Sequence, residues 1–307
     1  MTDRTDGFRG LEVLAPGALS LIQDAGRFGY GAVGVGRSGA ADGAAFRRGA
    51  ALLGNTPDCA AIEVLFGGLT VRAHGALSIV VTGAAMPVAI DGVLVDRGGP
   101  WTIPDGAAVA LGSASVGLRG YLSVRGGITV PTVLGSRSTD TLAGLGPAKL
   151  GRGDRLPIGP TDGPVSVAAA AMPTSFDPAP PPDSPGRATT VDPAVLAVTP
   201  GPRLDWFADP EQLVSTRWVM SAHSDRIGLR LTGGVLTRIP GLPELPSEGM
   251  VLGCLQVPPS GEPVLLMPDH PVTGGYPVIG VVTEASMELA AQLRPGQSVR
   301  FRWRRVG

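Results

Sequence analysis

Glycine and proline divide this sequence into many short segments, and that division restricts the fold more than any other feature. Of 307 residues, 46 are glycine and 30 are proline. The runs between them are short and rich in β-branched residues, as in residues 77–82 and 278–282. Short runs of this kind, bounded by turn residues, are typical of strands joined by tight turns. The sequence therefore predicts a mainly β protein.

Strands outnumber helices in the predicted element order. The predicted strands are residues 11–14, 69–73, 77–82, 88–90, 108–111, 121–124, 195–199, 228–231, 264–267, 278–282 and 299–303. Helices are predicted for residues 42–53, 210–218 and 286–293. Asp42 can cap the first helix, and Asp209 can cap the second, which then has Pro210 at its first position. The expected fold class is mainly β with a few short helices.

The two halves of the chain share a set of landmarks in the same order. Arg27-Phe28-Gly29 parallels Arg226-Ile227-Gly228, and Val81-Thr82-Gly83 parallels Val272-Thr273-Gly274. Two copies of one β unit, each of about 110 residues, would have a workable domain size. Closing each copy into a barrel removes exposed sheet edges, so two tandem β-barrel lobes are expected.

Composition along the chain suggests four parts. We expect a first β-barrel lobe at 11–115 and a second at 191–307. A bridging β segment at 116–159 has no counterpart in the second half and contains a Ser-Arg-Ser-Thr loop. Residues 160–190 are rich in proline and alanine, which predicts a linker.

Charge and hydropathy exclude several classes of protein. Charged residues make up 17 % of the chain and the net charge is −1, which argues against nucleic-acid binding. No stretch reaches the roughly 18 apolar residues that a membrane span needs. The polar start of the sequence does not resemble a signal peptide. Cys59 and Cys254 lie far apart among apolar neighbours and are interpreted as buried thiols, so the expected location is cytoplasmic.

Residues 29–34 form a literal GxGxxG motif, but its surroundings do not suit a dinucleotide. Such a site needs a following helix and an acidic residue about twenty positions on. Residues 35–39 are too rich in glycine to open a helix, and Asn55 stands where the acid should be. Lys149 also lacks the glycine frame of a phosphate-binding P-loop. Neither motif predicts a nucleotide site in this chain.

The stretch 23–42 carries the most function-like polar residues, on a glycine-rich backbone that a ligand could approach closely. Arginine can hold a carboxylate through two hydrogen bonds, and aspartate can orient groups or move protons. The alternative is structural: a local ion pair between Asp24 and Arg27, with Asp42 as a helix cap only. The candidate catalytic residues are Asp24, Arg27, Tyr30, Ser38 and Asp42.

A second candidate loop, 135–139, concentrates hydroxyl groups and a guanidinium. Such a loop can form an anion nest for carboxylate or phosphate, or it can be a solvated turn. A matching polar set lies in the second half, where Gln256, like Glu63 in the first half, stands inside a strand and either points outward or is buried with a partner. The histidines His74, His223 and His270 share no metal-binding spacing. The candidate substrate- or phosphate-binding residues are Ser136, Arg137, Ser138, Thr139, Arg226, Glu248 and Gln256.

Taken together, these motifs resemble the KipA / allophanate hydrolase subunit 2 family, which also comprises the C subunit of 5-oxoprolinase and the biotin-dependent carboxyltransferase subdomain A/B. The resemblance covers nearly the whole chain, with Ala41 and the His270-Pro271 pair as mild departures. The residues that carry it are 21–30 (LIQDAGRFGY), 38–42 (SGAAD), 135–139 (GSRST), 224–228 (SDRIG), 247–249 (SEG), 255–258 (LQVP) and 273–277 (TGGYP).

The resemblance implies two cyclophilin-like barrels and a heteromeric enzyme. It implies a KipI-like B subunit and a LamB/YcsF-like A subunit as partners, with ATP used at the level of the complex. The implied activity is a hydrolase that opens 5-oxoproline to glutamate, and the isolated chain is expected to be inactive. One alternative is the carboxyltransferase component of a biotin-dependent urea carboxylase/allophanate hydrolase system. Another is a non-catalytic regulator that binds a KipI-like kinase inhibitor.

Overall fold

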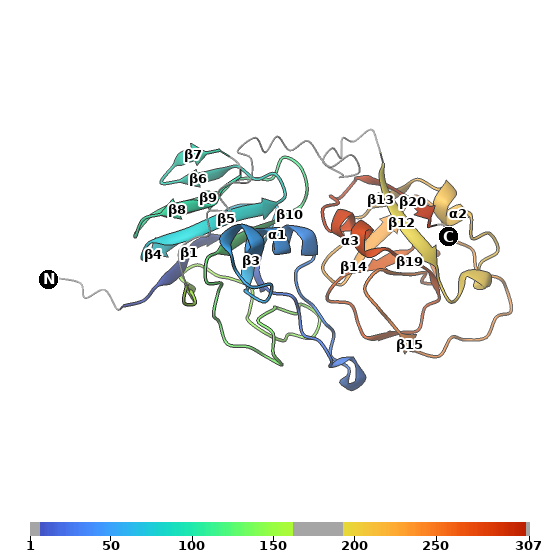
Figure 1. The fold of residues 1–307 in the computed structure, drawn as a ribbon. Helices are drawn as coiled ribbons and strands as arrows, with labels where there is room; N and C mark the ends of the chain where they lie inside the picture. The colour runs from blue at the N-terminus through green and yellow to red at the C-terminus, as the bar shows by residue number, and fades with distance from the viewer. Residues whose placement is uncertain (1–6, 97, 162–192, 305–307) are drawn as a thin grey trace. The chain divides into compact units, whose positions relative to one another are not determined.

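Strands make up most of the regular structure in this computed structural model, which describes residues 7–96, 98–161 and 193–304 (Figure 1). The predicted mainly β class is confirmed. Most of the predicted linker at 160–190 lies outside the described residues. None of the helices in the described ranges is long and apolar enough to cross a membrane.

The described residues form two compact units. The first contains residues 7–26, 43–139 and 145–161, and the second contains residues 27–42, 140–144 and 193–304. Two short segments, 27–42 and 140–144, therefore belong to the second unit although their sequence neighbours belong to the first. The predicted parts at 11–115, 116–159 and 191–307 do not separate these segments, and their boundaries remain a prediction.

The first unit contains two antiparallel sheets and one helix (Figure 1). The helix α1 (Gly43–Leu53) packs on β5 and β10. The six-stranded sheet has the order β11 (Arg155–Pro157), β1 (Gly10–Pro16), β4 (Leu69–His74), β9 (Ala108–Leu111), β6 (Val88–Ile90) and β7 (Val93–Val95). The five-stranded sheet has the order β2 (Leu19–Gln23), β3 (Ala61–Leu65), β10 (Arg119–Val124), β5 (Leu77–Gly83) and β8 (Trp101–Ile103).

One apolar core joins the strands of the first unit. Alternate residues of β4, Leu69, Val71 and Ala73, are fully buried in it, as the two-residue period of a strand requires. The helix α1 approaches β10 closely because Gly49 has no side chain: a Cβ there would lie 2.5 Å from the hydroxyl of Ser123. The small residue at position 49 therefore lets α1 cover the sheet.

A buried polar group lies between strands β3 and β10. The hydroxyl of Tyr121 donates to Glu63 Oε2 at 2.7 Å, and Arg119 Nε lies 3.6 Å from Glu63 Oε1. All three residues are less than 5 % exposed. The question that the sequence left open for Glu63 is settled: its carboxylate is buried with partners.

The second unit is built on a closed barrel of seven strands (Figure 1). Only β12 and β20 pair in parallel, and every other neighbouring pair in the barrel is antiparallel. Closure leaves the barrel without an open edge. The barrel order is β12 (Ala194–Pro200), β19 (Val278–Val282), β16 (Cys254–Gln256), β17 (Val264–Leu266), β14 (Gly228–Thr232), β13 (Trp218–Met220) and β20 (Ser298–Trp303).

Short elements complete the second unit. They are the two-stranded ribbon β15 (Glu248–Gly249) and β18 (Thr273–Gly274), the helices α2 (Gln212–Ser215) and α3 (Glu284–Ala290), and the 3-10 turns η1 (Gly31–Val33) and η3 (Leu204–Trp206). The helix α2 is shorter than the predicted 210–218. Trp218 is fully buried as the first residue of β13, and its indole donates to the carbonyl of Leu213 at 2.9 Å, so the helix must end before it.

Both cysteines carry free thiols. Cys254 is buried as predicted, and burial raises the pKa of its thiol. Cys59 is only half-buried, which corrects the prediction for that residue, because it lies in the turn before β3 and not inside a strand.

Replacing Tyr121 with Phe should destabilise the protein. The change removes the hydroxyl that donates to the buried Glu63 carboxylate, and an unsatisfied buried acceptor costs about 1–3 kcal/mol. Urea denaturation should show a free energy of unfolding lower by that amount. Tyr276→Phe is the matched control, since Tyr276 is 45 % exposed, and equal losses in the two variants would contradict the structural role of Tyr121.

Candidate functional site

The first cluster of predicted site residues surrounds the carboxylate of Asp24, directly after β2 in the first unit. Asp24 Oδ1 accepts from the hydroxyls of Ser136 and Ser138 at 2.7 and 2.6 Å. The same oxygen accepts from the N–H of Gly26 at 2.8 Å, and Oδ2 accepts from the N–H of Arg137 at 2.6 Å. Four donors thus converge on one buried carboxylate.

The Ser-Arg-Ser-Thr loop is therefore built around an internal anion. Ser136 and Ser138 are fully buried, and both hydroxyls donate to Asp24. Because both hydroxyl protons are used within the chain, neither serine offers a hydroxyl donor to the phosphates of ATP in this arrangement. The side chain of Arg137 is half-buried, and its Nε donates to the carbonyl of Val130 at 2.9 Å. A binding role for the loop residues remains a prediction.

Gln23 and Thr139 tie the end of the loop to β2. Gln23 Nε2 donates to the Thr139 carbonyl at 2.9 Å, and the Thr139 N–H donates to the Ile22 carbonyl at 2.9 Å. The Thr139 hydroxyl donates to the Pro147 carbonyl at 2.9 Å. Within the described part of the chain, Gln23 Oε1 is buried without a hydrogen-bond partner. Thr139 thus has a structural role that its place in a polar motif does not reveal.

The second cluster surrounds Asp269, in the second unit. Asp269 Oδ1 accepts from the hydroxyl of Ser38 at 2.6 Å and from Arg226 Nη2 at 2.9 Å. Oδ2 accepts from Arg226 Nε at 2.9 Å and from the N–H and hydroxyl of Thr141 at 3.0 and 2.7 Å. The carboxylate is 1 % exposed. It joins residues that are far apart in the sequence.

Backbone contacts fix the same region. Ser38 has a left-handed backbone with a φ of 53°, a conformation that is unusual for a residue with a side chain. Its N–H donates to the Pro268 carbonyl at 3.1 Å, while Arg226 Nη2 donates to the Gly39 carbonyl at 2.6 Å. The segment 27–42 is therefore held at Ser38 and Gly39 by residues of the barrel unit.

From the sequence, Asp24 is a possible ion-pair partner of Arg27, but the structure places Arg27 beside Asp140. Its Nη1 lies 3.9 Å from Asp140 Oδ2, and both side chains are buried. Asp140 Oδ1 accepts from the N–H groups of Leu142 and Ala143 at 2.9 and 2.8 Å. Arg27 thus neutralises Asp140 in the second unit, whereas Asp24 organises a loop of the first unit.

His270 is a buried histidine beside the second cluster. Its Nδ1 lies 2.8 Å from the carbonyl oxygen of Pro271, so Nδ1 carries the proton and Nε2 is the acceptor in the neutral form. Burial lowers the pKa of His270, although the Pro271 carbonyl, Asp269 and Asp140 act in the opposite direction. The imidazole is therefore held as a neutral ring.

The remaining predicted site residues have separate surroundings. Tyr30 is half-buried and its carbonyl accepts from the N–H groups of Val33 and Val35 at the η1 turn. Asp42 Oδ2 accepts from the side chain of Gln292 at 2.6 Å.

On the β15–β18 ribbon, Glu248 forms an ion pair with Arg203. Gln256 is buried, with Nε2 3.2 Å from the sulfur of Met250 and 3.4 Å from the Tyr276 carbonyl. The sequence left open whether Gln256 points outward, and the structure buries it.

Sequence reasoning missed Asp140, Thr141 and Asp269. Asp140 and Thr141 directly follow the predicted loop, and Asp269 follows the predicted strand 264–267 by two positions. A carboxylate just past the end of a strand lies at the rim of a sheet, which is where a polar cluster can form. The position of Asp269 just after a predicted strand was therefore the sequence signal that could have identified it as a candidate site residue.

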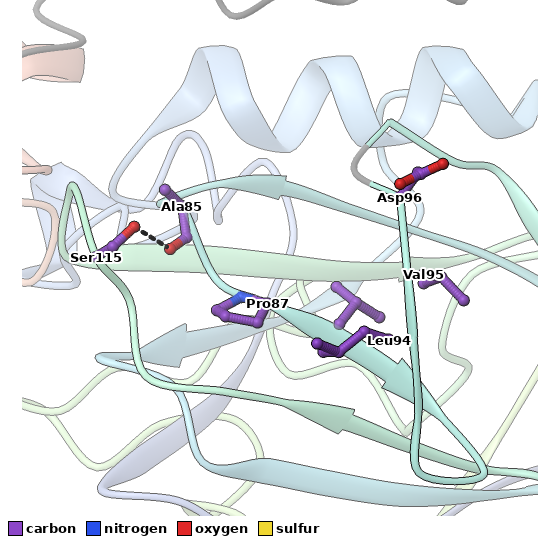
Figure 2. A pocket seen from close by; sticks show the side chains of 7 residues that line it. Ala85, Pro87, Leu94, Val95, Asp96 and Ser115 are labelled. Carbon is purple, nitrogen blue, oxygen red and sulfur yellow. Dashed lines mark hydrogen bonds between the residues drawn. The ribbon is translucent and has the colours of Figure 1, made fainter.

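A pocket of about 340 Å³ lies in the first unit beside the β6–β7 hairpin (Figure 2). It contains none of the predicted site residues. Its lining is mostly apolar and consists of Ala85, Pro87, Val88, Leu94, Val95, Asp96 and Ser115.

Comparison with known proteins shows that this chain is similar to carboxyltransferase domains and to the C subunit of 5-oxoprolinase. Residues 33–303 match the family model of the carboxyltransferase domain, subdomain A and B. The chain is 34 % identical over 298 residues to the C subunit of 5-oxoprolinase from Escherichia coli, a match that covers 95 % of this chain and 90 % of that protein. It is 31 % identical to the urea amidolyase of Lachancea kluyveri over 94 % of this chain but only 17 % of that protein.

The fold is similar to part of a much longer enzyme. The crystal structure of the K. lactis urea amidolyase superimposes with a TM-score of 0.85 and 31 % identity. The match covers 97 % of this chain and 19 % of that chain, so the present chain corresponds to about a fifth of the larger protein.

Replacing Asp269 with Asn should destabilise the second unit in a pH-dependent way. Burial acts to raise the pKa of Asp269, but the charge of Arg226 and the hydrogen bonds from Arg226, Ser38 and Thr141 outweigh it and hold the pKa below its ordinary value. The stability gained from the ionised carboxylate is therefore complete above the unfolded pKa of about 4 and is lost as the pH falls through the folded pKa.

The change leaves Arg226 buried without its counter-charge, which costs about 3–5 kcal/mol. Urea denaturation at pH values from 7 to 3 gives the free energy of unfolding of wild type and of Asp269→Asn. The difference between the two values should be constant at pH 5–7 and should become smaller below about pH 4. Asp205→Asn, at an exposed aspartate, is the control. If the difference in the free energy of unfolding did not change with pH, the charge of Asp269 would not be the source of the stabilisation.

Proposed function

The chain belongs to the carboxyltransferase family of subdomains A and B, and we propose on that basis that it is one component of a heteromeric, ATP-dependent 5-oxoprolinase. The observation that carries the proposal is the extent of its similarity to the C subunit of the Escherichia coli 5-oxoprolinase. That similarity covers 95 % of this chain and 90 % of the relative at 34 % identity. Correspondence over nearly the whole of both chains favours the same place in the same kind of complex.

The proposed reaction opens the ring of a cyclic amide. Water adds to the lactam carbonyl, the C–N bond breaks, and the nitrogen leaves as the amine of glutamate, with hydrolysis of ATP to ADP and phosphate driving the step. The proposed partners are a KipI-like B subunit and a LamB/YcsF-like A subunit in the cytoplasm. The isolated chain is expected to be inactive.

We assign positioning roles to the buried carboxylates. Asp24 organises the loop 136–138, and Asp269 organises Ser38, Thr141 and Arg226. A carboxylate that already accepts four or five hydrogen bonds is poorly suited to take a proton from water. The proposed contacts to an anionic substrate therefore fall to less buried groups, with Arg137 as the first candidate because its guanidinium is half-buried.

Groups outside the loop 136–138 would have to bind ATP. The hydroxyls of Ser136 and Ser138 and the N–H of Arg137 all donate to Asp24. We therefore assign no step of the reaction to a nucleotide held by these residues.

A carboxyltransferase component is the second candidate. The matching family model is that of a carboxyltransferase domain, and urea amidolyases are among the relatives. In that case biotin would be carried by another polypeptide, and the small amide substrate would be urea or allophanate. A regulator without turnover, bound to a KipI-like protein, is the third candidate.

Reconstitution separates these candidates. The chain would be purified with KipI-like and LamB/YcsF-like proteins of the same organism and assayed with 5-oxoproline and ATP. Equal release of ADP and glutamate supports the 5-oxoprolinase. Carboxylation of urea by a biotin-carrying partner, with no glutamate formed, would instead support the carboxyltransferase. A stable complex that turns over neither substrate would support the regulator.

Replacing Arg137 with Ala should lower activity without preventing assembly. Loss of a charged hydrogen bond to an anionic substrate costs about 1.5–3 kcal/mol, which is a fall of about 10- to 100-fold in kcat/KM for 5-oxoproline. The exposed Arg72→Ala is the matched control and should keep normal kinetics. Unchanged kcat/KM in Arg137→Ala would remove this residue from the site.

A further inference from the structure

A tight turn before β3 fixes the position of an exposed aspartate in the first unit. Residues 56–59 form this turn, and the N–H of Cys59 closes it by donating to the Thr56 carbonyl at 3.1 Å. Pro57 is the second residue of the turn, a position that suits the fixed φ of proline. Asp58 follows as the third residue, and its side chain is exposed.

Hydrogen bonds attach this turn to the chain that follows β10. Just before the turn, Asn55 donates through Nδ2 to the Val124 carbonyl and accepts at Oδ1 from the Gly126 N–H, both at 2.8 Å. Just after the turn, the N–H of Ile128 donates to the Ala60 carbonyl at 3.0 Å. This bridge is antiparallel, so the chain before Ala60 runs alongside the chain after Ile128. The turn therefore has a fixed place next to the chain that leads to the Ser-Arg-Ser-Thr loop.

Arg137 reaches back to the same place. Its Nε donates to the carbonyl of Val130 at 2.9 Å. Val130 comes two residues after one member of the antiparallel bridge, and Asp58 comes two residues before the other. The hydroxyl of Thr56, the N–H of Asp58 and the charge of Arg137 hold the pKa of Asp58 below its ordinary value, while burial acts in the opposite direction. The guanidinium of Arg137 thus acts on the Asp58 carboxylate across this bridge.

The two charged groups remain available to a ligand. Within the described part of the first unit, Asp58 and Arg137 act on each other electrostatically without forming a direct ion pair. The Val130 carbonyl occupies Nε of Arg137 and leaves the N–H groups of Nη1 and Nη2 as donors. The pair therefore offers a fork of donors and, beside it, a separate acceptor.

A donor fork beside an acceptor matches a molecule that has a carboxylate next to an N–H. Arginine binds a carboxylate through two parallel N–H groups, and a carboxylate of the protein accepts strongly from an N–H donor. In 5-oxoproline the carboxylate is attached to the carbon that neighbours the ring N–H, so both groups lie on one edge of the molecule. An anion without an N–H meets Asp58 only as a like charge, which lowers its affinity. Urea has N–H groups but no carboxylate for Arg137.

We propose that Asp58 determines substrate specificity together with Arg137: Arg137 binds the substrate carboxylate, and Asp58 accepts a hydrogen bond from the adjacent amide N–H. The inference rests on the proposed 5-oxoprolinase function and deepens it, because it names the substrate class as acids with an amide N–H next to the carboxylate. Both residues bind the substrate, and neither takes a proton in the reaction. The turn 56–59 and the Val130 carbonyl hold the two groups in place before the substrate arrives, which reduces the entropy cost of binding.

Two matched compounds test the contact of Asp58. In 5-oxotetrahydrofuran-2-carboxylate a ring oxygen replaces the N–H of 5-oxoproline, and the carboxylate is kept. The dissociation constants of both compounds are measured by calorimetry on the reconstituted complex with a non-hydrolysable ATP analogue. Asp58→Ala should weaken binding of 5-oxoproline by about 10- to 100-fold, because a charged hydrogen bond is lost. Binding of the lactone should stay the same or become tighter, since the lactone has no N–H for Asp58 to accept.

Three further measurements serve as controls. Asp58→Asn keeps an oxygen acceptor at the same place and should restore part of the affinity for 5-oxoproline. Asp105→Ala, at another exposed turn aspartate, which accepts from the Gly75 N–H at 2.7 Å, should bind both compounds as wild type does. Arg137→Ala should weaken binding of the lactone but not of 2-pyrrolidinone, which has the lactam ring and no carboxylate. An unchanged melting temperature shows that each variant folds.

Two results would overturn the inference. If the complex turns over 5-oxoproline but Asp58→Ala binds it as tightly as wild type, or loses the same factor for the lactam and the lactone, Asp58 does not contact the N–H and the proposed function stands. If the wild-type complex carboxylates urea and does not bind 5-oxoproline, the proposed function fails and the inference fails with it. A loss that is confined to 5-oxoproline supports both.

Discussion

The hydrogen bonds of the Asp269 carboxylate are the interaction on which the second unit depends most. They gather Ser38, Thr141 and Arg226, residues from three separate stretches of the sequence, around one buried charge. A buried carboxylate is costly unless it is fully paired, so the arrangement works only when all three stretches are in place. The left-handed backbone of Ser38 is retained because its hydroxyl and its N–H are both held.

The first unit uses the same principle at Asp24. Two serine hydroxyls and two backbone N–H groups satisfy its carboxylate, and the loop that supplies most of them takes its shape from that requirement. Hydroxyl-rich loops near an arginine suggest binding of an external anion. In this molecule the loop binds an anion of its own chain, and that finding moves the search for substrate contacts to the less buried Arg137.

Local sequence patterns predicted much of the secondary structure. They did not predict which distant residues become neighbours in the fold. The strands β4, β5 and β19 were predictable because their turn residues and β-branched runs are local signals. The pairing of Glu63 with Tyr121 was not, because it depends on which strands become neighbours. Asp269 was missed for the same reason: its partners lie 43 to 231 positions away in the sequence.

The order in which the chain contributes to its two units has a consequence for how the protein can be made or divided. The described chain passes from one unit to the other after residues 26, 42, 139 and 144, and again between 161 and 193. Residues 193–304 alone would lack Ser38, Gly39 and Thr141. Of the hydrogen bonds described above for the side chains of Arg226 and Asp269, a fragment cut at the proline-rich stretch would keep only the two between these residues. During synthesis, residues 27–42 leave the ribosome long before the barrel of the second unit has formed. They can take their final place only after the last barrel strand, β20, has been made.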